Sequence, residues 1–273
     1  MSDGAAVPSG PPAIPEADLE RRFGGLARLY GDAAYRRLRM ARVAVVGVGG
    51  VGSWAAEALA RSGAARLTLI DLDQVGESNV NRQVQALGST LGMAKVDALA
   101  QRIADIHPGC AVRRVESFVD AINWPGLLGG EAVDAVIDAC DDVRAKAAIA
   151  SWALATGDTV IVVGAAGGKR QPERVETGDL AEATHDPILA SLRQRLRKHH
   201  GAARSGAIGI RCVFSREEVA APAGATTEIE GSLNCHGYGS SVMVTATFGL
   251  VAATLALEAA MRATSRTAAT ATL

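Results

Sequence analysis

The chain has 273 residues, which suffices for one large α/β domain or for one domain with an appended subdomain. Hydrophobic residues make up 48% of it, enough for a sizeable buried core. The formal net charge of -1, from 28 basic and 29 acidic residues, excludes nucleic-acid binding through bulk charge, so any such contact needs a local basic patch.

The N-terminal segment 1–18 is predicted to be a disordered tail, because residues 1–16 are rich in Pro, Gly, Ala and Ser. This segment has neither a basic start nor an apolar run, so it does not resemble a signal peptide. We therefore expect a cytoplasmic protein. Residues 19–40 are rich in Arg and Leu and predict a helical lead-in to the domain.

Strand and helix patterns alternate through the next part of the chain. Buried strands are predicted at 42–47, 67–70, 111–117, 132–137 and 159–163, and helices at 53–62, 92–106 and 144–156. This alternation predicts an α/β class fold, a Rossmann-type doubly wound and mostly parallel sheet with helices on both faces. We expect a single domain over residues 19–262, with its core at 41–168.

The pattern is less regular after Gly168. A helix is predicted at 181–200, followed by a loop-rich stretch at 201–239 that includes a strand-like run at 210–214. Residues 242–257 carry no charge but are about 16 residues long, short of the ~20 that span a bilayer. We therefore predict a core or subunit-interface helix and no membrane association, with a C-terminal tail at 263–273.

A glycine-rich turn between the first strand and the first helix predicts an adenine nucleotide site. Gly47, Gly49, Gly50 and Gly52 permit a tight turn and let backbone N–H groups approach phosphate at the helix N-terminus. Asp71 ends the second strand, 19 residues after Gly52, where it would accept hydrogen bonds from ribose hydroxyls. NAD and ATP sites share these features.

The residues that follow favour ATP. A triphosphate needs cations near its reacting end, and Arg82 and Lys95 would supply them. Asp141 follows the strand that ends near Asp138, at the carboxyl edge of the sheet, where its carboxylate would hold Mg²⁺. The alternative for Arg82 and Lys95 is a solvated surface without a ligand.

Three further motifs, Asp71-x-Asp73, Asn79-x-Asn81-Arg82-Gln83 and Asp138-Ala-Cys-Asp141, accompany the glycine turn and Lys95. Together they resemble the E1-like adenylating superfamily. More narrowly, the chain resembles the bacterial tRNA threonylcarbamoyladenosine dehydratase family, because the match also includes Cys212-Val-Phe-Ser215 and Met243-Val-Thr-Ala-Thr-Phe-Gly249 outside the nucleotide site. The resemblance runs from Arg22 to about Met261. The positions that it assigns to ATP binding are Gly47, Gly49, Gly50, Gly52, Asp71, Asp73, Asn79, Asn81, Arg82, Gln83, Lys95, Asp138 and Asp141.

The resemblance implies ATP-dependent dehydration, or cyclisation, of N6-threonylcarbamoyladenosine at position 37 of tRNA. The carboxylate would be adenylated with release of pyrophosphate, and a nitrogen of the same side group would then displace AMP. Effective molarities of intramolecular closures reach ~10⁵ M or more, so no protein nucleophile is strictly required. The resemblance makes Arg82, Lys95 and Asp141 catalytic candidates, with residues 169–262 as the substrate, tRNA and dimer region.

Cys235 is a fourth catalytic candidate, in the glycine-flanked sequence Asn-Cys-His-Gly-Tyr-Gly. The resemblance implies an acyl or persulfide acceptor with His236 as activator, and the alternative is an ordinary small loop residue. Cys110, Cys140 and Cys212 are interpreted as structural. No C-x-x-C pair is present, so we expect no zinc site and no disulfide framework, as in a reducing compartment.

A basic run at 185–204 is a candidate tRNA contact. Leu189, Leu192 and Leu196 fall at helical spacing on one side of it, so the basic side would meet tRNA phosphates. A solvated helix face is the alternative. The candidate tRNA-binding residues are Arg193, Arg195, Arg197 and Lys198.

The resemblance also implies a two-fold homodimer, and its family is associated with a cysteine desulfurase and a sulfur-acceptor protein. It does not decide whether a monovalent cation is bound. Many E1-like enzymes take an arginine from the partner's N-terminal segment, but the aligned position here is Gly25, so Arg22 or Arg28 would have to substitute.

Three other functions compete with this interpretation. The first is adenylation of a sulfur-carrier or ubiquitin-like protein, which would use the same ATP site. The second is an NAD-dependent oxidoreductase, which would leave Arg82 and Lys95 without a role. The third is a non-catalytic nucleotide sensor or membrane-associated scaffold.

Overall fold

The computed structural model describes residues 17–220 and 238–262. One seven-stranded sheet runs through them in the order β3-β2-β1-β4-β5-β7-β6. All neighbouring strands are parallel except β6, which pairs antiparallel with β7 at one edge. The predicted α/β fold is therefore confirmed. The strands are β1 (Arg42–Val46), β2 (Arg66–Ile70), β3 (Ala111–Val115), β4 (Ala135–Asp138), β5 (Val160–Val163), β6 (Val175–Asp179) and β7 (Arg211–Ser215).

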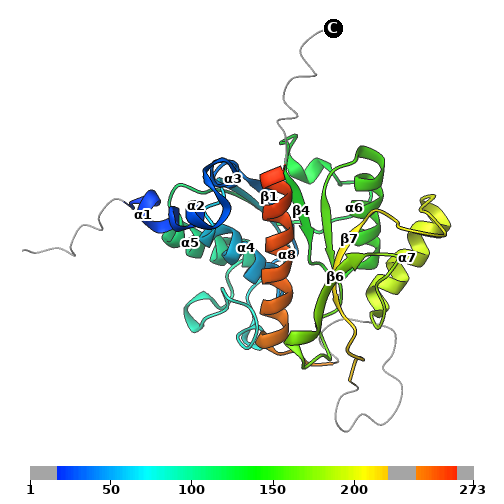
Figure 1. Ribbon diagram of the computed structural model, residues 1–273. Coiled ribbons are helices and arrows are strands. Elements are labelled where there is room, and N and C mark those ends of the chain that lie inside the picture. The colour runs from blue at the N-terminus through cyan, green and yellow to red at the C-terminus, as the bar shows by residue number, and fades with distance from the viewer. Residues whose placement is uncertain (1–16, 221–237, 263–273) are drawn as a thin grey trace, which may run out of the picture.

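Helices cover both faces of the sheet (Figure 1). On one face lie α3 (Asp32–Leu38), α4 (Gly52–Arg61), α5 (Lys95–Ile106) and α8 (Val242–Arg262). On the other lie α6 (Val143–Thr156) and α7 (Pro187–His199). The lead-in also contains α1 (Leu19–Phe23) and α2 (Gly25–Tyr30), and short 3-10 turns span Glu77–Asn79, Gly88–Thr90, Gly126–Leu128 and Pro172–Arg174.

Strand β1 shows how the sequence produces two cores. Val43 and Val45 belong to the core beneath α4 and α8, while Ala44 and Val46 belong to the core beneath α6. All four side chains are buried because helices cover both faces, which explains the continuous apolar run instead of an alternating one. The strand order changes direction between β1 and β4, and ligands of such sheets bind at that point, outside the carboxyl ends of the strands.

Helix α8 is the one helix among the described residues that is long and apolar enough to cross a membrane. Here it packs on the sheet and on α4, with Val244, Phe248 and Ala252 buried. Gly249 permits the close approach, since a Cβ at that position would lie 2.5 Å from the Val51 carbonyl oxygen. Burial against the core therefore accounts for one side of this apolar helix, while Met243 and Leu250 are exposed on it.

Two helix starts and one strand differ from the sequence-based predictions. Helix α7 begins at Pro187 rather than at 181, because Asp186 caps it by accepting a hydrogen bond from Leu189 N, and proline favours the first turn. Helix α5 begins at Lys95 rather than at 92. Strand β6 was not predicted at all, because this edge strand is half exposed and contains a glycine and three polar residues.

Candidate active site

A cavity of about 1240 Å³ lies outside the carboxyl ends of β1, β2, β4 and β5. It exceeds the ~300–1,000 Å³ of ordinary small-molecule pockets, so it has room for a nucleotide and part of a second substrate. Its lining brings together most of the predicted nucleotide-binding residues. These are Gly47, Gly49, Gly50, Asp71, Asp73, Asn79, Arg82, Gln83, Lys95 and Asp141.

The glycine turn is tight for a structural reason. Gly47 has a φ of 77°, and a Cβ there would lie 2.9 Å from the Cα of Cys140 on the neighbouring β4–α6 turn. A Cβ on Gly52 would lie 1.8 Å from the Gly47 carbonyl oxygen. Both positions therefore require glycine, and the compact turn leaves the start of α4 open to the cavity.

Asp71 is held by the glycine turn. Its Oδ2 accepts a hydrogen bond from Val48 N at 2.8 Å, and its Oδ1 accepts one from Asp73 N at 2.9 Å. Burial raises the pKa of the Asp71 carboxyl above its ordinary value, although nearby Lys95 and both N–H donors oppose this. The carboxylate thus lies at a fixed position in the cavity wall, as a ribose acceptor needs.

Lys95 is fixed at the start of α5. Its Nζ lies 2.6 Å from Asp73 Oδ2, and only 6% of the residue is exposed. The backbone reinforces this arrangement, because Lys95 N donates to the Asp73 carbonyl. One ammonium is therefore held where the carboxyl ends of β1 and β2 meet the cavity.

The segment after β2 carries the second cation of the cavity. Arg82 Nη1 donates to the Ser78 carbonyl at 2.6 Å and to Asn81 Oδ1 at 3.0 Å. Asn81 Nδ2 reaches the Ser240 carbonyl at 2.9 Å, next to the start of α8. Asn79 Oδ1 accepts from Gly76 N at 2.9 Å and so stabilises its own 3-10 turn. This network orients Arg82 before any ligand is bound.

The two aspartates of the β4–α6 turn have different environments. Asp141 is exposed in the cavity and makes no hydrogen bond with the described residues. Asp138 is fully buried below the turn, and its Oδ1 lies 3.2 Å from Lys146 Nζ. Asp141 is thus available to a ligand or cation, whereas Asp138 supports the turn.

Three of the predicted ATP-binding residues do not line the cavity, namely Gly52, Asn81 and Asp138. Each is next to a lining residue in the sequence, namely Val51, Arg82 and Ala139. Cys235 and His236 lie outside the described residues. The sequence analysis missed Gln85, which is 1% exposed and donates from Nε2 to the Val48 carbonyl at 2.8 Å, and Lys146. In the sequence, Gln85 and Lys146 could have been identified only as polar residues in an otherwise apolar pattern.

The basic side of α7 divides into two pairs. Arg193 donates to the carbonyls of Leu180 and Ala183, and Arg197 donates to that of Ala203, so both stabilise the chain around the helix. Arg195 and Lys198 are exposed and have no hydrogen-bond partner within 17–220 and 238–262. The side chains of this second pair are the more accessible to a polyanion.

Arg22 and Arg28, the two candidates to replace an arginine from a dimer partner, also differ in their contacts. Arg22 Nη1 donates to the carbonyls of Asp105 and Ile106 and so caps the C-terminus of α5. Arg28 is exposed on α2 without a hydrogen bond to the described part of the chain. Arg28 is therefore the better placed of the two to reach another molecule.

Comparisons with known proteins agree with this geometry. The model of the ThiF family matches residues 22–272. The chain is 42% identical over 257 residues to the tRNA threonylcarbamoyladenosine dehydratase of Escherichia coli (strain K12), covering 90% of this chain and 96% of that protein. It is 38% identical over 247 residues to the dehydratase of the same name from Haemophilus influenzae, covering 88% and 94%.

Solved structures give the same result. The crystal structure of the Escherichia coli tRNA N6-threonylcarbamoyladenosine dehydratase in complex with ATP matches with a TM-score of 0.81 and 42% identity. That match covers 90% of this chain and 96% of the other. The complex of the same enzyme with AMP matches with a TM-score of 0.81 and 41% identity, covering 91% and 98%.

Proposed function

This chain belongs to the ThiF family and, within it, to the tRNA threonylcarbamoyladenosine dehydratases, and we infer that it uses ATP to dehydrate N6-threonylcarbamoyladenosine at position 37 of tRNA. The observation that carries this function is the cavity at the β1–β4 switch point, where a glycine turn, Asp71, two cations and Asp141 converge. An E1-like adenylation site needs each of these groups.

The first step is adenylation. A carboxylate oxygen of the threonylcarbamoyl group attacks the α-phosphorus of ATP, the bond to the bridging oxygen breaks, and pyrophosphate leaves with the electron pair. Arg82 and Lys95 provide positive charge for the phosphates, where negative charge increases in the transition state. Both are held by hydrogen bonds from their own surroundings, so little reorganisation is required.

Mg²⁺ fits the same site. Asp141 presents a carboxylate to the cavity without a hydrogen-bond partner in the described part of the chain, and Mg²⁺ is typically bound by one or two carboxylates together with substrate phosphates. When bound, the cation would neutralise phosphate charge and thereby favour departure of pyrophosphate. Asp142 does not share this role, because its Oδ1 accepts hydrogen bonds from the first turn of α6.

The second step is ring closure. A nitrogen of the same side group attacks the activated carbonyl, its proton passes to solvent, and AMP leaves with the former carboxylate oxygen. The net change is the loss of one water from the nucleoside. The protein's contribution is to hold the reacting groups together and exclude water, because an intramolecular closure gains most of its rate from orientation.

Several partners extend this proposal. The tRNA would contact the free charges on the outer side of α7, Arg195 and Lys198, with Arg193 and Arg197 supporting that helix. A homodimer would place Arg28 at a second active site. The proposal also includes Cys235 as an acyl or persulfide acceptor and a cysteine desulfurase with its sulfur-acceptor protein as partners. A bound monovalent cation and a cytoplasmic location complete it.

The decisive experiment is mass spectrometry of nucleosides from threonylcarbamoylated tRNA after incubation with this protein, ATP and Mg²⁺. The expected result is a loss of one water from the modified adenosine, which Arg82→Ala abolishes. A matched control is Arg36→Ala, a remote exposed arginine on α3. Unchanged nucleoside mass, with pyrophosphate exchange stimulated by a carrier protein instead of tRNA, would contradict the proposal.

A further inference from the structure

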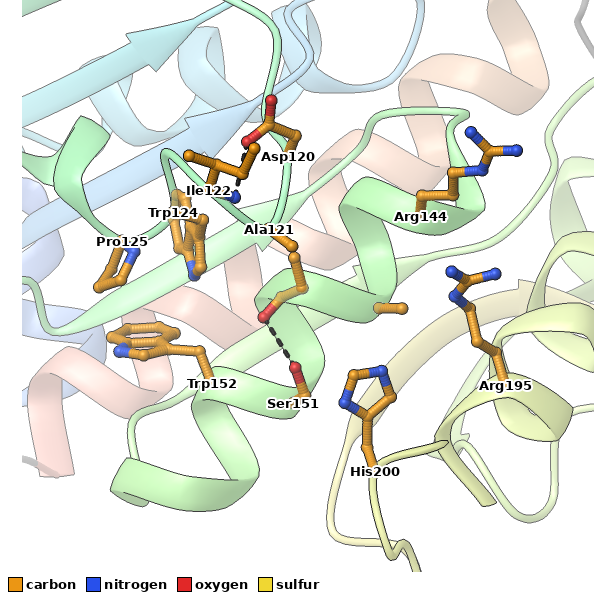
Figure 2. Close-up of a pocket in the computed structure, with 12 residues that line it drawn as sticks. Asp120, Ala121, Ile122, Trp124, Pro125, Arg144, Ser151, Trp152, Arg195 and His200 are labelled. Atoms are coloured by element: carbon orange, nitrogen blue, oxygen red, sulfur yellow. Dashed lines mark hydrogen bonds between the residues drawn. The ribbon is translucent and has the colours of Figure 1, made fainter. Parts of the chain in front are cut away.

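A second hollow, of about 590 Å³, lies beside the nucleotide cavity and has no part in the steps above. It is bounded by residues 120–125, by α6 and by the C-terminal end of α7 (Figure 2). The segment 117–125 separates the two spaces: residues 117–119 line the cavity, and residues from 120 onwards line the hollow. Whatever binds in the hollow therefore lies next to the adenylation site.

One side of the hollow is cationic. Figure 2 shows the guanidinium groups of Arg144, on α6, and Arg195, on α7, on the same side of the space. Both residues are exposed, and neither side chain has a hydrogen bond or ion pair within the described ranges. His200 adds an imidazole ring at the end of α7. Two unpaired guanidinium forks at one hollow match the charge and shape of phosphate.

The other side is aromatic and apolar. Trp124 and Trp152 meet edge to face, with ring centroids 5.4 Å apart and planes at 87°. Trp124 is buried, whereas Trp152 is partly exposed, and neighbouring Ile122 is 95% exposed. Partly exposed aromatic rings beside cations are the groups that bind unpaired nucleotides, since the ring stacks on the base and the cation meets the phosphate.

The segment between the two spaces is ordered by its own hydrogen bonds. Asp120 Oδ1 accepts from Ile122 N at 2.8 Å and from Asn123 N at 2.9 Å, and Asn123 Nδ2 donates to the Phe118 carbonyl at 2.8 Å. The single acid that lines the hollow thus has its charge directed to backbone N–H groups. It opposes an anionic ligand less than a free carboxylate would.

We propose that this hollow binds a nucleotide of the substrate tRNA adjacent to the modified adenosine, with Arg144 and Arg195 on phosphate and Trp152 stacked on a base. The proposal rests on the proposed function, because tRNA is the substrate that brings an unpaired base and its phosphate together. It places the anticodon loop across the segment 117–125, with the threonylcarbamoyl group in the cavity on one side and a neighbouring nucleotide on the other.

The test combines binding and kinetics with labelled threonylcarbamoylated tRNA. At low salt, the Arg144→Ala/Arg195→Ala double variant should weaken tRNA binding about 10-fold or more and reduce the salt slope by ~1.4, as two lost phosphate contacts predict. Its KM for tRNA should rise, while its Kd for ATP in the absence of tRNA should change less than about twofold. Trp152→Leu should weaken binding by roughly 5- to 100-fold, as for one lost stacking contact.

Two comparisons make the outcome clear. Arg36→Ala on α3 removes an exposed arginine far from the hollow and should bind tRNA as the wild type does. Unchanged affinity and salt slope in the double arginine variant, in an enzyme that still dehydrates the tRNA, would overturn the proposed role of the hollow and the Arg195 contact, while leaving the proposed reaction intact. A wild-type protein that neither binds nor alters the tRNA would instead overturn the proposed function.

Discussion

Lys146 and Asp138 form an ion pair inside the protein, with Nζ 3.2 Å from Oδ1 and both side chains fully buried. Lys146 Nζ also donates to the carbonyls of Asp138 and Val163, so it connects the ends of β4 and β5 beneath the cavity. Burial by itself lowers the pKa of Lys146, but the Asp138 carboxylate reverses this and raises the pKa above its ordinary value. The ammonium therefore stays charged.

Lys146→Met should destabilise the protein by about 3–5 kcal/mol, because it leaves the Asp138 carboxylate buried without its cation. Chemical denaturation measures this directly. The matched control is the double variant Lys146→Met/Asp138→Leu, which removes both charges and should be more stable than Lys146→Met alone. Equal stability of the single and double variants would show that the unpaired buried carboxylate carries no penalty, contrary to this prediction.

Asp141→Asn should lower kcat/KM for dehydration at least about 10-fold and raise the Mg²⁺ concentration required, since it removes the one cavity carboxylate that has no internal hydrogen bond in the described chain. Asp142→Asn is the control, because asparagine also caps helices and preserves the hydrogen bonds to α6. Equal losses in both variants would assign the effect to local charge and not to cation binding.

Gly52→Ala should abolish ATP binding and lower the melting temperature, because its Cβ would lie 1.8 Å from the Gly47 carbonyl oxygen and the turn would have to open. Isothermal titration with ATP and thermal unfolding test this. At Gly88 an added Cβ meets nothing within 4 Å, so Gly88→Ala should leave both quantities nearly unchanged. Normal ATP affinity in Gly52→Ala would disprove the tight turn.

His107 should make stability depend on pH. It is 2% exposed, packs 4.7 Å from the Phe23 ring and lies 3.2 Å from Arg39 Nη1. Burial and then the Arg39 charge lower its pKa below the ordinary value of about 6.5. Below that pH the unfolded chain binds more protons than the folded one, so the free energy of unfolding falls as the pH falls from 6.5 through the folded-state pKa.

Thermal unfolding between pH 7.5 and 5.5 measures this effect. The comparison is His107→Gln, which keeps an acceptor for Arg39 but cannot become charged. The wild type should lose more stability than His107→Gln as the pH falls, so the two curves should converge toward acid pH. Parallel curves would show that the pKa of His107 is the same in the folded and unfolded chain.

The sequence predicted the parts of the fold that local patterns encode. The apolar run at β1, the glycine turn and the helix formers of α4 specify their structures within a few residues, and the structure has them there. Strand β6 could not be predicted in this way, because Glu176 and Gly178 do not favour a strand. It forms because β7 offers it an open edge for pairing.

The residues of the candidate site also divide into those that local sequence patterns predict and those that depend on distant parts of the chain. Asp71 was predicted from its spacing to the glycine turn and Asp141 from its place after a strand, and the structure has both in the lining of one cavity. Gln85 and Lys146 were missed because their roles depend on carbonyl groups from distant strands and turns. A sequence pattern records the polarity of such residues but not the acceptors that surround them.

The shared wall 117–125 would link the two proposed binding events thermodynamically if its conformation differed between the occupied and the empty hollow. If an occupied hollow holds this wall in the conformation that suits the nucleotide, the enzyme binds ATP more tightly in the presence of tRNA. By linkage, ATP must then tighten tRNA binding by the same factor. Such an enzyme would use little ATP when substrate tRNA is scarce, and selectivity would come from cooperation between its two ligands.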